Sequence, residues 1–593
     1  MEDHDGQERT TSEIAPQACG SCRKQKRRCD KQLPTCSLCL RIGRNCGYSA
    51  ETQTNQPSPE EFAALKDQVA SLEQLLRTTT QSSGSLQSGT NGTPNGSSSN
   101  SSNSLNGNSP ASLLLSPGRP PPWTGPASFP SLFFLDSNAF EYERLQIQAP
   151  HVKVPPGALT ALGSSAELRE MIEHYFATVH VYYPIISKIR LYQHLANPLH
   201  EPGADIALLF LAMKLICSDI PEGQPPQTQL YLDVKSFYSY VEAQNGFSIQ
   251  LIQSLCLISL YELGHCVYPA AYLSIGASAR LGHAMGLHAK GVPQMLARPS
   301  TWTEQEERRR VWWGVIVLDR FINIGHRGKS FGSNDPGLDC HLPTDDAAWD
   351  RGQMLVAAPL SLSASQTTRV SPFARTCQSA HLLGKAIAHI DDKQLPLSYR
   401  FGEALQISRT LRALADVLPD DTASPELMDT NDLETSAPYT SMAIAYSGLL
   451  TLYDAYSCTE QASTLHLAGE AGPGAEHGRG TGLSMGEEQL QMQQASIHGL
   501  EEISSRVLFL ARRVRRNVDS KGVAAVSPLV VDAIYQAAAN YAWYVRETSD
   551  PTCGERLLEL KELLVLLDRR WKVAGEYLRI VEAAEFYLQS AIR

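Results

Sequence analysis

Residues 19–46 read CGSCRKQKRRCDKQLPTCSLCLRIGRNC and contain six of the chain's 13 cysteines. The pattern Cys-x2-Cys-x6-Cys occurs twice, with six residues between the two copies. The thiols lie at Cys19, Cys22, Cys29, Cys36, Cys39 and Cys46. The other seven cysteines are scattered singly, and cysteines clustered in this way are typical of metal ligands rather than of a disulfide framework. Two copies of one half-motif predict a module with pseudo-twofold structure.

The number of thiols limits how many zinc ions the module can hold. Structural zinc sites are tetrahedral, so each ion needs four ligands. Two ions need eight coordination positions, which six cysteines supply only if two thiolates bridge both ions. Two alternatives remain. Four of the cysteines could bind a single zinc ion and leave two spare, or the cysteines could form a redox site without zinc. The repetition of both spacings favours two zinc ions, and we expect the module to be unfolded without metal.

The charge of this stretch is opposite to that of the rest of the chain. Residues 19–46 carry +7, whereas the whole chain carries −11, so the remainder carries −18. Six thiolates and two Zn²⁺ would lower the module to +5, which still attracts phosphate. A short helix after the second cysteine is predicted to enter the major groove of double-stranded DNA, where Lys and Arg read guanine. The predicted contact residues are Arg23, Lys24, Gln25, Lys26, Arg27 and Arg28. A nuclear-import signal is the alternative interpretation of this basic run.

The stretch ACGSCRKQKRRCDKQLPTCSLCLRIGRNCGYS (18–49) resembles the fungal six-cysteine binuclear zinc-cluster transcription regulators. The resemblance covers all six cysteines, the basic run, Asp30, Pro34 and Tyr48. It implies a nuclear protein with two zinc ions, in which Cys19 and Cys36 bridge the metals. It also implies that CGG-type half-sites are read from positions 25 and 26. Lys26 fits this role, whereas Gln25 departs from the basic residue that is commoner in the family.

A heptad pattern follows the cluster at residues 60–77. Apolar residues are spaced 3, 4, 3 and 4 apart, at Phe62, Leu65, Val69, Leu72 and Leu76. This spacing predicts a short parallel coiled coil, and hence a homodimer, with Glu61 facing Lys66 of the partner. The alternative is a single amphipathic helix that packs on the rest of the chain, because barely two heptads are marginal alone.

The remaining sequence divides by composition into flexible and helical regions. Residues 1–18 are predicted to be disordered, 19–48 form the zinc module, and 49–59 are a linker before the coiled coil. Residues 78–122 are a Ser/Asn/Gly-rich tether. Residues 166–593 show helical periodicity, which predicts a large all-α regulatory domain with loop insertions near 416–438 and 469–486. The individual helical patterns cover residues 168–189, 206–217, 249–264, 268–287, 304–324, 488–518, 529–547 and 555–592. The predicted fold class is therefore mostly α. No membrane span is expected, because no apolar run approaches ~18 residues. The acidic N-terminus does not resemble a secretory signal.

Three segments of the body resemble the regulatory region of the same family. They are HYF (174–176) leading to YPII (183–186), ASARLGHAMGLH (277–288) and EERRRVWWGVIVLD (306–319). We expect Arg308, Arg309 and Arg310 to pair with acids on neighbouring helices, while Val311, Trp312, Val315, Ile316 and Leu318 form an apolar helix face. The acidic stretch 416–434 is a candidate for recruiting transcription machinery, although a disordered insertion is the preferred interpretation.

Several patterns that suggest other chemistry are weak. GHRGKS (325–330) ends like a phosphate-binding loop, but Asn323 stands where glycine is needed, and a helix is expected before it. His283 and His288 are five residues apart, which does not match metal pairing on a helix, and Asp345–Asp346 and Asp420–Asp421 are interpreted as solvated loop residues. We predict no enzyme. The leading hypothesis is a sequence-specific regulator of RNA polymerase II transcription acting on a pathway-specific gene set, such as a secondary-metabolite cluster. The alternative is a zinc-stabilised protein-interaction scaffold that does not read bases.

Overall fold

The computed structural model describes the chain in two separate units, Met1–Ser116 and Pro117–Arg593. The described residues are 15, 17–24, 29–43, 45–46, 131–142, 147, 150–196, 203–221, 223–289, 294–325, 328–354, 360–364, 370–418, 437–457, 485–548 and 550–590. The predicted coiled coil at 60–77 and the predicted tether at 78–122 lie outside these residues. So does the interior of each predicted insertion in the body.

The first unit contains two short helices, α1 (Gly20–Lys24) and α2 (Ser37–Arg41). Each helix begins one residue after the first cysteine of a half-motif, which confirms the pseudo-twofold arrangement of the sequence at the level of secondary structure. Its buried core consists of cysteines alone, namely Cys19, Cys22, Cys36 and Cys39. Among the described residues, the partly buried Leu38 is the one aliphatic side chain that packs against this core. The stability of the core therefore depends on what the thiols bind.

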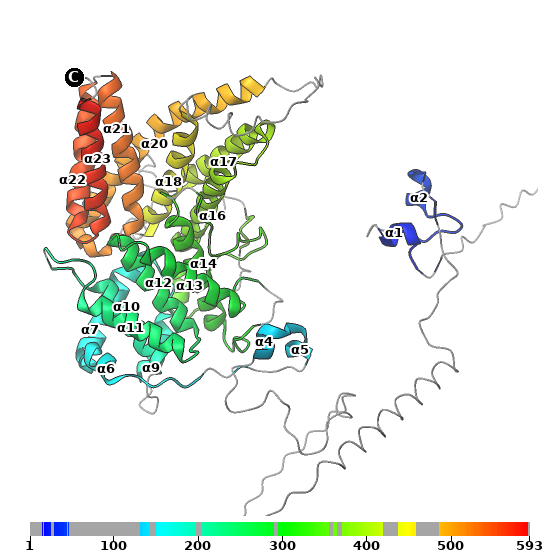
Figure 1. Cartoon of the computed structure of the whole chain (residues 1–593), viewed down its shortest axis with the longest axis horizontal. Helices are drawn as coiled ribbons and strands as arrows, with labels where there is room; N and C mark the ends of the chain where they lie inside the picture. The colour runs from blue at the N-terminus through cyan, green and yellow to red at the C-terminus, as the bar shows by residue number, and fades with distance from the viewer. Residues whose placement is uncertain are drawn as a thin grey trace, which may run out of the picture. The chain divides into compact units, whose positions relative to one another are not determined.

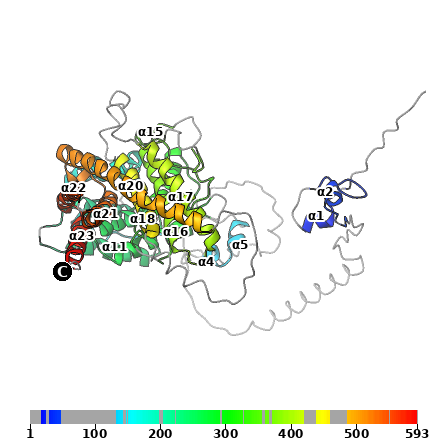
Figure 2. The same cartoon turned by 90° about the horizontal axis from the view of Figure 1, so that it is seen from above.

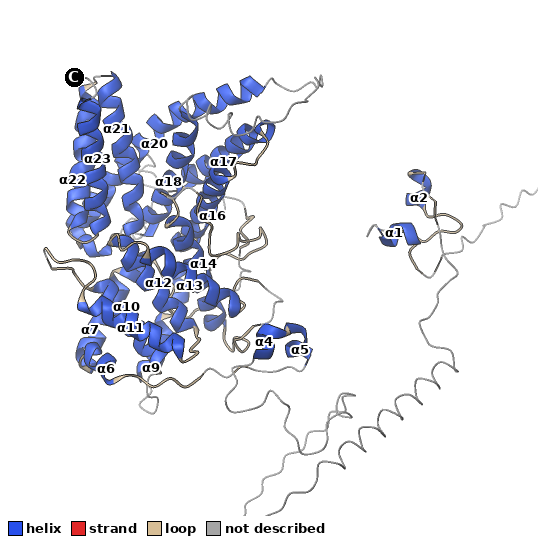
Figure 3. Ribbon diagram, viewed as in Figure 1, coloured by secondary structure: helices blue, strands red, loops and turns tan. Residues whose placement is uncertain are grey.

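The second unit is built from helices, and no strand occurs among its described residues (Figures 1 and 3). Its first half comprises α4 (Ser131–Leu135), α5 (Ser137–Tyr142), α6 (Pro156–Leu162), α7 (Ser165–Ala177), α8 (Val179–Tyr182), α9 (Lys188–Ala196), α10 (Ala204–Cys217), α11 (Gln229–Ala243), α12 (Ile249–Gly264), α13 (Ala270–Ala284) and α14 (Trp302–Phe321). Its second half comprises α15 (Asp346–Asp350), α16 (Pro372–Asp391), α17 (Leu397–Val417), α18 (Ala437–Ser457), α20 (Met485–Lys521), α21 (Val531–Thr548), α22 (Pro551–Asp568) and α23 (Lys572–Ser590). Within the described part of the chain, no helix is long and apolar enough to cross a membrane.

Side-chain caps fix where many of these helices begin. Ser164 accepts a hydrogen bond from the Glu167 amide, and the Glu167 carboxylate accepts one from the Ser164 amide, which completes a capping box at α7. At α14 the Thr301 side chain accepts a hydrogen bond from the Glu304 amide, without the reciprocal contact of a capping box. These caps satisfy amide donors that a helix leaves without partners in its first turn.

The core of the second unit lies between helices that are buried almost all round. Every residue of α12 except Gln250 is buried, and so are most residues of α10. Both helices pack against each other, and α12 also packs against α13 and α14. α14, the helix of the EERRRVWWGVIVLD segment, is buried from Arg310 to Phe321. A helix without a polar face belongs in the interior of a large domain.

The C-terminal helices form a second layer of the same unit. α16 packs on α18, and α18 packs on the long helix α20, which runs alongside it in both views (Figures 1 and 2). α21, α22 and α23 pack on one another in succession. Trp571, between α22 and α23, is fully buried and donates from Nε1 to the Val526 carbonyl at 2.8 Å.

The predicted all-α body is confirmed, but individual elements differ from the expectation. The predicted helical segment 555–592 is two helices, α22 and α23, which are separated at Arg569–Trp571. The segment 168–189 is likewise interrupted, because the chain leaves helical conformation between Tyr183 and Ser187. Helices α11, α16, α17 and α18 were not predicted. Their periodicity is obscured by buried polar side chains, such as Thr376, Gln378 and Ser379 in α16.

The arginine triplet of α14 pairs with acids, but mostly with acids of α14 itself rather than of neighbouring helices as expected; only Asp346 belongs to another helix. Arg308 contacts Glu304, Arg309 contacts Glu306, and Arg310 contacts both Glu306 and Asp346. The prediction of solvated loop residues holds for Asp345, which is exposed and precedes α15, but was wrong for Asp346. Asp345 caps α15 through the Ala348 amide, and Asp346 accepts a hydrogen bond from the buried Arg310 at 2.7 Å. The helix expected before the GKS sequence is α14.

Candidate metal centre

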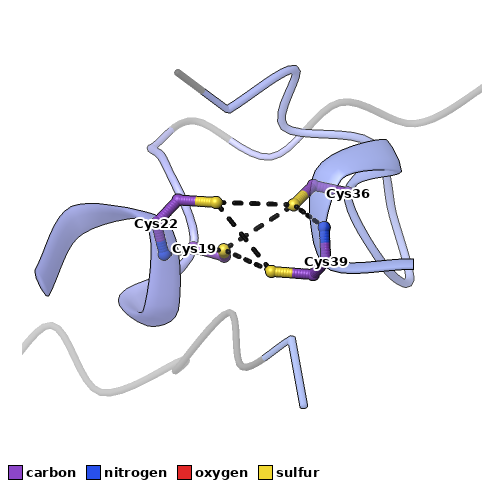
Figure 4. A group of neighbouring side chains, drawn as sticks. All are labelled: Cys19, Cys22, Cys36 and Cys39. Carbon is purple, nitrogen blue, oxygen red and sulfur yellow. Dashed lines mark hydrogen bonds between the residues drawn. The ribbon is translucent and has the colours of Figure 1, made fainter. Parts of the chain in front are cut away.

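Four thiols of the first unit meet at a single point, with their sulfur atoms directed toward one another (Figure 4). Cys19 Sγ lies 3.8 Å from Cys36 Sγ and 3.7 Å from Cys39 Sγ. Cys22 Sγ lies 3.8 Å from Cys36 Sγ and 3.9 Å from Cys39 Sγ. In a tetrahedron with Zn–S bonds of about 2.3 Å, the sulfurs are about 3.8 Å apart. The spacing of these thiols therefore fits tetrahedral zinc coordination.

The two half-motifs hold their first cysteine by the same backbone contact. The Cys22 amide donates to Cys19 Sγ at 3.4 Å, and the Cys39 amide donates to Cys36 Sγ at 3.5 Å. The hydrogen bond from the Cys39 amide lowers the pKa of the Cys36 thiol. Burial alone would raise the pKa of the Cys19 thiol, but the Cys22 amide and the neighbouring thiols lower it. Both shifts favour the thiolate form that zinc binds.

The remaining two cysteines flank this group. Cys29 and Cys46 pack against the four buried thiols. Cys46 Sγ accepts a hydrogen bond from the Cys36 amide at 3.3 Å. Cys29 and Cys36 also belong to a second close group, together with a carboxylate oxygen of Asp30. The structure thus brings all six predicted ligands together, with Cys36 shared between two groups.

Polar contacts outside the thiols fix the two halves relative to each other. The Asp30 carboxylate accepts hydrogen bonds from the Ser37 amide at 3.1 and 3.2 Å, at the start of α2. Ser21 Oγ, on α1, donates to the Asn45 carbonyl at 2.9 Å. Sequence analysis did not assign these roles. The Cys29–Asp30 pair was the one available signal, because an acid next to a ligand often supports it through the backbone.

The predicted DNA-contact residues are only partly described. Arg23 and Lys24 are the last two residues of α1, and the structure describes only their backbone. Gln25, Lys26, Arg27 and Arg28 lie outside the described residues, as do all five predicted dimerisation residues of the 60–77 segment. The geometry therefore supports the metal centre directly. It supports a DNA-binding role of the basic run only through the position of that run between Cys22 and Cys29.

Comparison with known proteins identifies both parts of the chain. Residues 17–55 match the family model of the fungal Zn(2)-Cys(6) binuclear cluster domain, which binds two zinc ions. Residues 172–374 match that of the fungal specific transcription factor domain, which contains all three segments quoted for the body.

Several similar proteins are also named as transcription factors or transcriptional activators. The chain is 34% identical over 178 residues to transcription factor BOA15 of Botryotinia fuckeliana, which covers 98% of that protein and 30% of this chain. It is 25% identical over 450 residues to transcription factor tazR of Aspergillus terreus, covering 70% of that protein and 64% of this chain. It is 26% identical over 403 residues to the citrinin biosynthesis transcriptional activator mrl3 of Monascus ruber, covering 74% of that protein and 65% of this chain.

The cysteine geometry, the two family models and these relatives agree with one another. The chain belongs to the fungal Zn(2)-Cys(6) transcription regulators.

Proposed function

We propose that this regulator binds CGG-type half-sites in double-stranded DNA and controls a pathway-specific gene set in the nucleus. The observation that carries the proposal is the tetrahedral spacing of the thiols of Cys19, Cys22, Cys36 and Cys39. The start of the basic run, Arg23 and Lys24, directly follows Cys22 on α1, which supports its assignment as the DNA-contacting segment. All six cysteines are the proposed ligands of two zinc ions, with Cys19 and Cys36 as the bridging pair.

Bound zinc would link the two half-motifs, because its ligands would come from both of them. The protein's own contribution is orientation, because the amides of Cys22 and Cys39 fix two of the sulfurs. We propose that the basic run Arg23, Lys24, Gln25, Lys26, Arg27 and Arg28, whose first two residues belong to α1, contacts DNA from this base. Lys26 is the proposed guanine-reading residue, and the other cations mainly contact phosphate.

The affinity of the full chain for a CGG-containing duplex and for a scrambled duplex tests this proposal. We expect a clear preference for CGG, and we expect Lys26→Ala to reduce that preference about tenfold, which corresponds to one lost base contact. Lys31→Ala is the control, because it removes the same charge from the loop between the half-motifs. It should weaken both affinities equally. Equal affinity of the unmodified chain for both duplexes would instead favour a zinc-stabilised interaction scaffold.

We also propose that the chain acts as a homodimer through residues 60–77. Phe62, Leu65, Val69, Leu72 and Leu76 would form the seam of a parallel coiled coil. Sedimentation of the Leu65→Ala/Leu72→Ala variant should show a shift toward monomer. The control, Asp67→Ala/Gln74→Ala, changes two positions on the opposite face and should sediment like the unmodified chain.

The names of several relatives suggest the type of target pathway. They include a pigment biosynthesis activator of Monascus ruber and an azaphilone cluster-specific factor of Aspergillus niger, besides the citrinin activator. We propose a secondary-metabolite gene cluster as the target, with residues 416–434 as a candidate contact for transcription machinery. Genome-wide occupancy mapping tests the target, and enrichment spread evenly over unrelated genes would contradict it.

A further inference from the structure

A cleft of about 450 Å³ opens in the second unit where five helices meet. It is lined by residues just after the end of α14, by the last turns of α16 and α18, and by parts of α21 and α23. Apolar side chains form part of its wall, among them Ile324, Ile387 and Leu450. Its volume is within the range of small-molecule sites. Neither the zinc module nor the described arginine network of α14 contributes to it.

The electrostatic character of the cleft is negative. Three carboxylates line it, Asp391, Asp454 and Asp532, and none of the described lining residues is basic. The C-terminal ends of α14, α16 and α18 also converge there, at Asn323, Asp391 and Asp454. The C-terminus of a helix carries a partial negative charge. Both features favour a cation.

A buried side chain in the cleft has an acceptor without a partner. Asn323 is 1% exposed, and its Nδ2 donates to the Asp319 carbonyl at 2.7 Å. Its Oδ1 is buried and forms no hydrogen bond. Buried polar atoms are nearly always paired, so an unpaired acceptor that lines a cleft indicates a missing donor. An N–H donor of a bound molecule would complete it.

Asp532 and two tyrosines provide a preformed surface on the opposite helices. Tyr577 Oη donates to Asp532 Oδ1 at 3.2 Å, and Gln536 Nε2 donates to Asp532 Oδ2 at 2.7 Å. The rings of Tyr535 and Tyr577 are stacked, with centroids 4.3 Å apart and planes at 13°. The carboxylate is therefore already oriented, and the tyrosine pair presents aromatic surface to the cleft.

We propose that this cleft binds a small organic amine, with its ammonium group held by the carboxylates and by Asn323 Oδ1. Its apolar part would contact the isoleucines and the tyrosine rings, since cations are attracted to such rings. Because the cleft joins the end of α14 to α21 and α23, a bound amine would stabilise one arrangement of these helices. A regulatory effect of that binding on transcription rests on the proposed function, whereas the binding itself does not.

Calorimetric titration of the full, zinc-loaded chain with three isosteric probes tests the charge preference. The probes are tyramine, its neutral analogue tyrosol and the anion 4-hydroxyphenylacetate, with putrescine and cyclohexylamine as amines of other shapes. We expect at least one of the three amines to bind, and we expect tyramine to bind at least about fivefold more tightly than tyrosol, as for one exposed ion pair. The anion should bind most weakly. Absence of binding by all three amines up to millimolar concentration overturns the proposal, as does equal affinity for the charged and neutral probes.

Rim variants locate the site without altering the core. Asp391→Asn and Asp454→Asn should each weaken binding of the amines that bind by about fivefold and leave the neutral probe unaffected. Asp519→Asn is the matched control, because it removes the same charge from an exposed position at the end of α20. Identical amine affinity in the cleft variants and the control overturns the assignment of the site. DNA preference is measured separately, so a chain that binds amine without preferring CGG contradicts only the proposed function.

Discussion

At the scale of single residues, Arg310 carries an unusual number of contacts for a fully buried cation. Its Nε donates to Glu306 at 3.0 Å, Nη1 to Asp346 at 2.7 Å and Nη2 to the Thr344 carbonyl at 2.8 Å. Its guanidinium also lies 4.2 Å from the centre of the Trp349 ring. A buried charge is tolerated only when it is paired and hydrogen-bonded. Arg310 therefore fixes the loop before α15 to the middle of α14.

Removing this cation should destabilise the second unit strongly. Arg310→Met removes one of the two arginine partners of the buried Glu306 and the arginine partner of Asp346, and we expect a loss of about 3–5 kcal/mol in the free energy of unfolding. Arg579→Met is the control, because Arg579 and its partner Glu576 are largely exposed on α23. It should cost less than about 1 kcal/mol. Urea denaturation followed by circular dichroism measures both, and equal losses would show that the buried network is unimportant.

His265 should make stability depend on pH in a predictable window. It is 1% exposed, lies against the rings of Tyr261 and Trp571, and both of its ring nitrogens lack partners. Burial, with a smaller effect of Arg570, lowers its pKa from 6.5 to about 3. Between these two pKa values the His265 ring is protonated in the unfolded chain but not in the folded one. The stability that depends on neutral His265 is therefore fully present above pH 6.5 and is lost as the pH falls toward 3.

Replacing His265 should remove that contribution. The variant His265→Phe should lose less stability between pH 6 and 4, with a slope lower by up to about 1.4 kcal/mol per pH unit. His151→Phe changes an exposed histidine and should leave the slope unaltered. Denaturation midpoints over this pH range give both slopes, and the same slope in both variants would mean that His265 does not titrate between the two states.

Residue roles were predictable where one short stretch defines the chemistry. The grouping of the six cysteines follows from spacing and type alone, and so does the pairing of Arg308, Arg309 and Arg310 with acids, although not which acids. Asp346 was misinterpreted because its partner is 36 residues away in the sequence. The contact depends on how the loop folds back on α14, which no local pattern encodes.

At the scale of elements, the end of α12 requires a glycine. A Cβ on Gly264, the last residue of this helix, would lie 2.5 Å from Cε3 and 2.8 Å from Cζ3 of Trp571. Trp571 cannot move away easily, because it is fully buried and hydrogen-bonded to Val526. The glycine thus permits the close approach of α12 to the α22–α23 corner.

Substitutions at two helical glycines should have opposite effects. Gly264→Ala should destabilise the unit by about 1–3 kcal/mol through overpacking. Gly554→Ala, in α22, meets open space and should stabilise it by up to about 1 kcal/mol, because alanine favours helix. Thermal unfolding compares the two variants with the unmodified chain. A gain in melting temperature for Gly264→Ala would contradict the packing described for Trp571.

Helices were predictable where burial coincides with apolar sequence. α10, α12 and α14 satisfy this condition and were predicted close to their observed bounds. α18 does not, because Thr440, Ser441 and Ser447 are buried in it. Their environment is set by α16 and α20, which are distant in sequence.

At the scale of the whole molecule, each unit has a core of a different kind. Cysteines form the core of the first unit, and aliphatic and aromatic side chains form that of the second. The contrast in charge and composition between the two parts was visible in the sequence. The amine cleft was not, because its lining residues come from five segments between Asn323 and Ile580.

Removing zinc should therefore unfold one unit and spare the other. After treatment with a strong chelator, we expect DNA binding to be lost while the helical signal and melting temperature of the second unit stay unchanged. Adding zinc back should restore DNA binding with two ions per chain, measured by elemental analysis. A parallel loss of helical signal would show that the body also depends on metal.

The separate cysteine core has a consequence for how such regulators diverge. Among the described residues, the two buried cores share no member, so a substitution in the zinc module removes no side chain from the core of the helical body. Target choice can then drift, or be exchanged between paralogues by recombination, without a thermodynamic penalty in the body. Natural selection can therefore change which genes are bound while the helical body is retained.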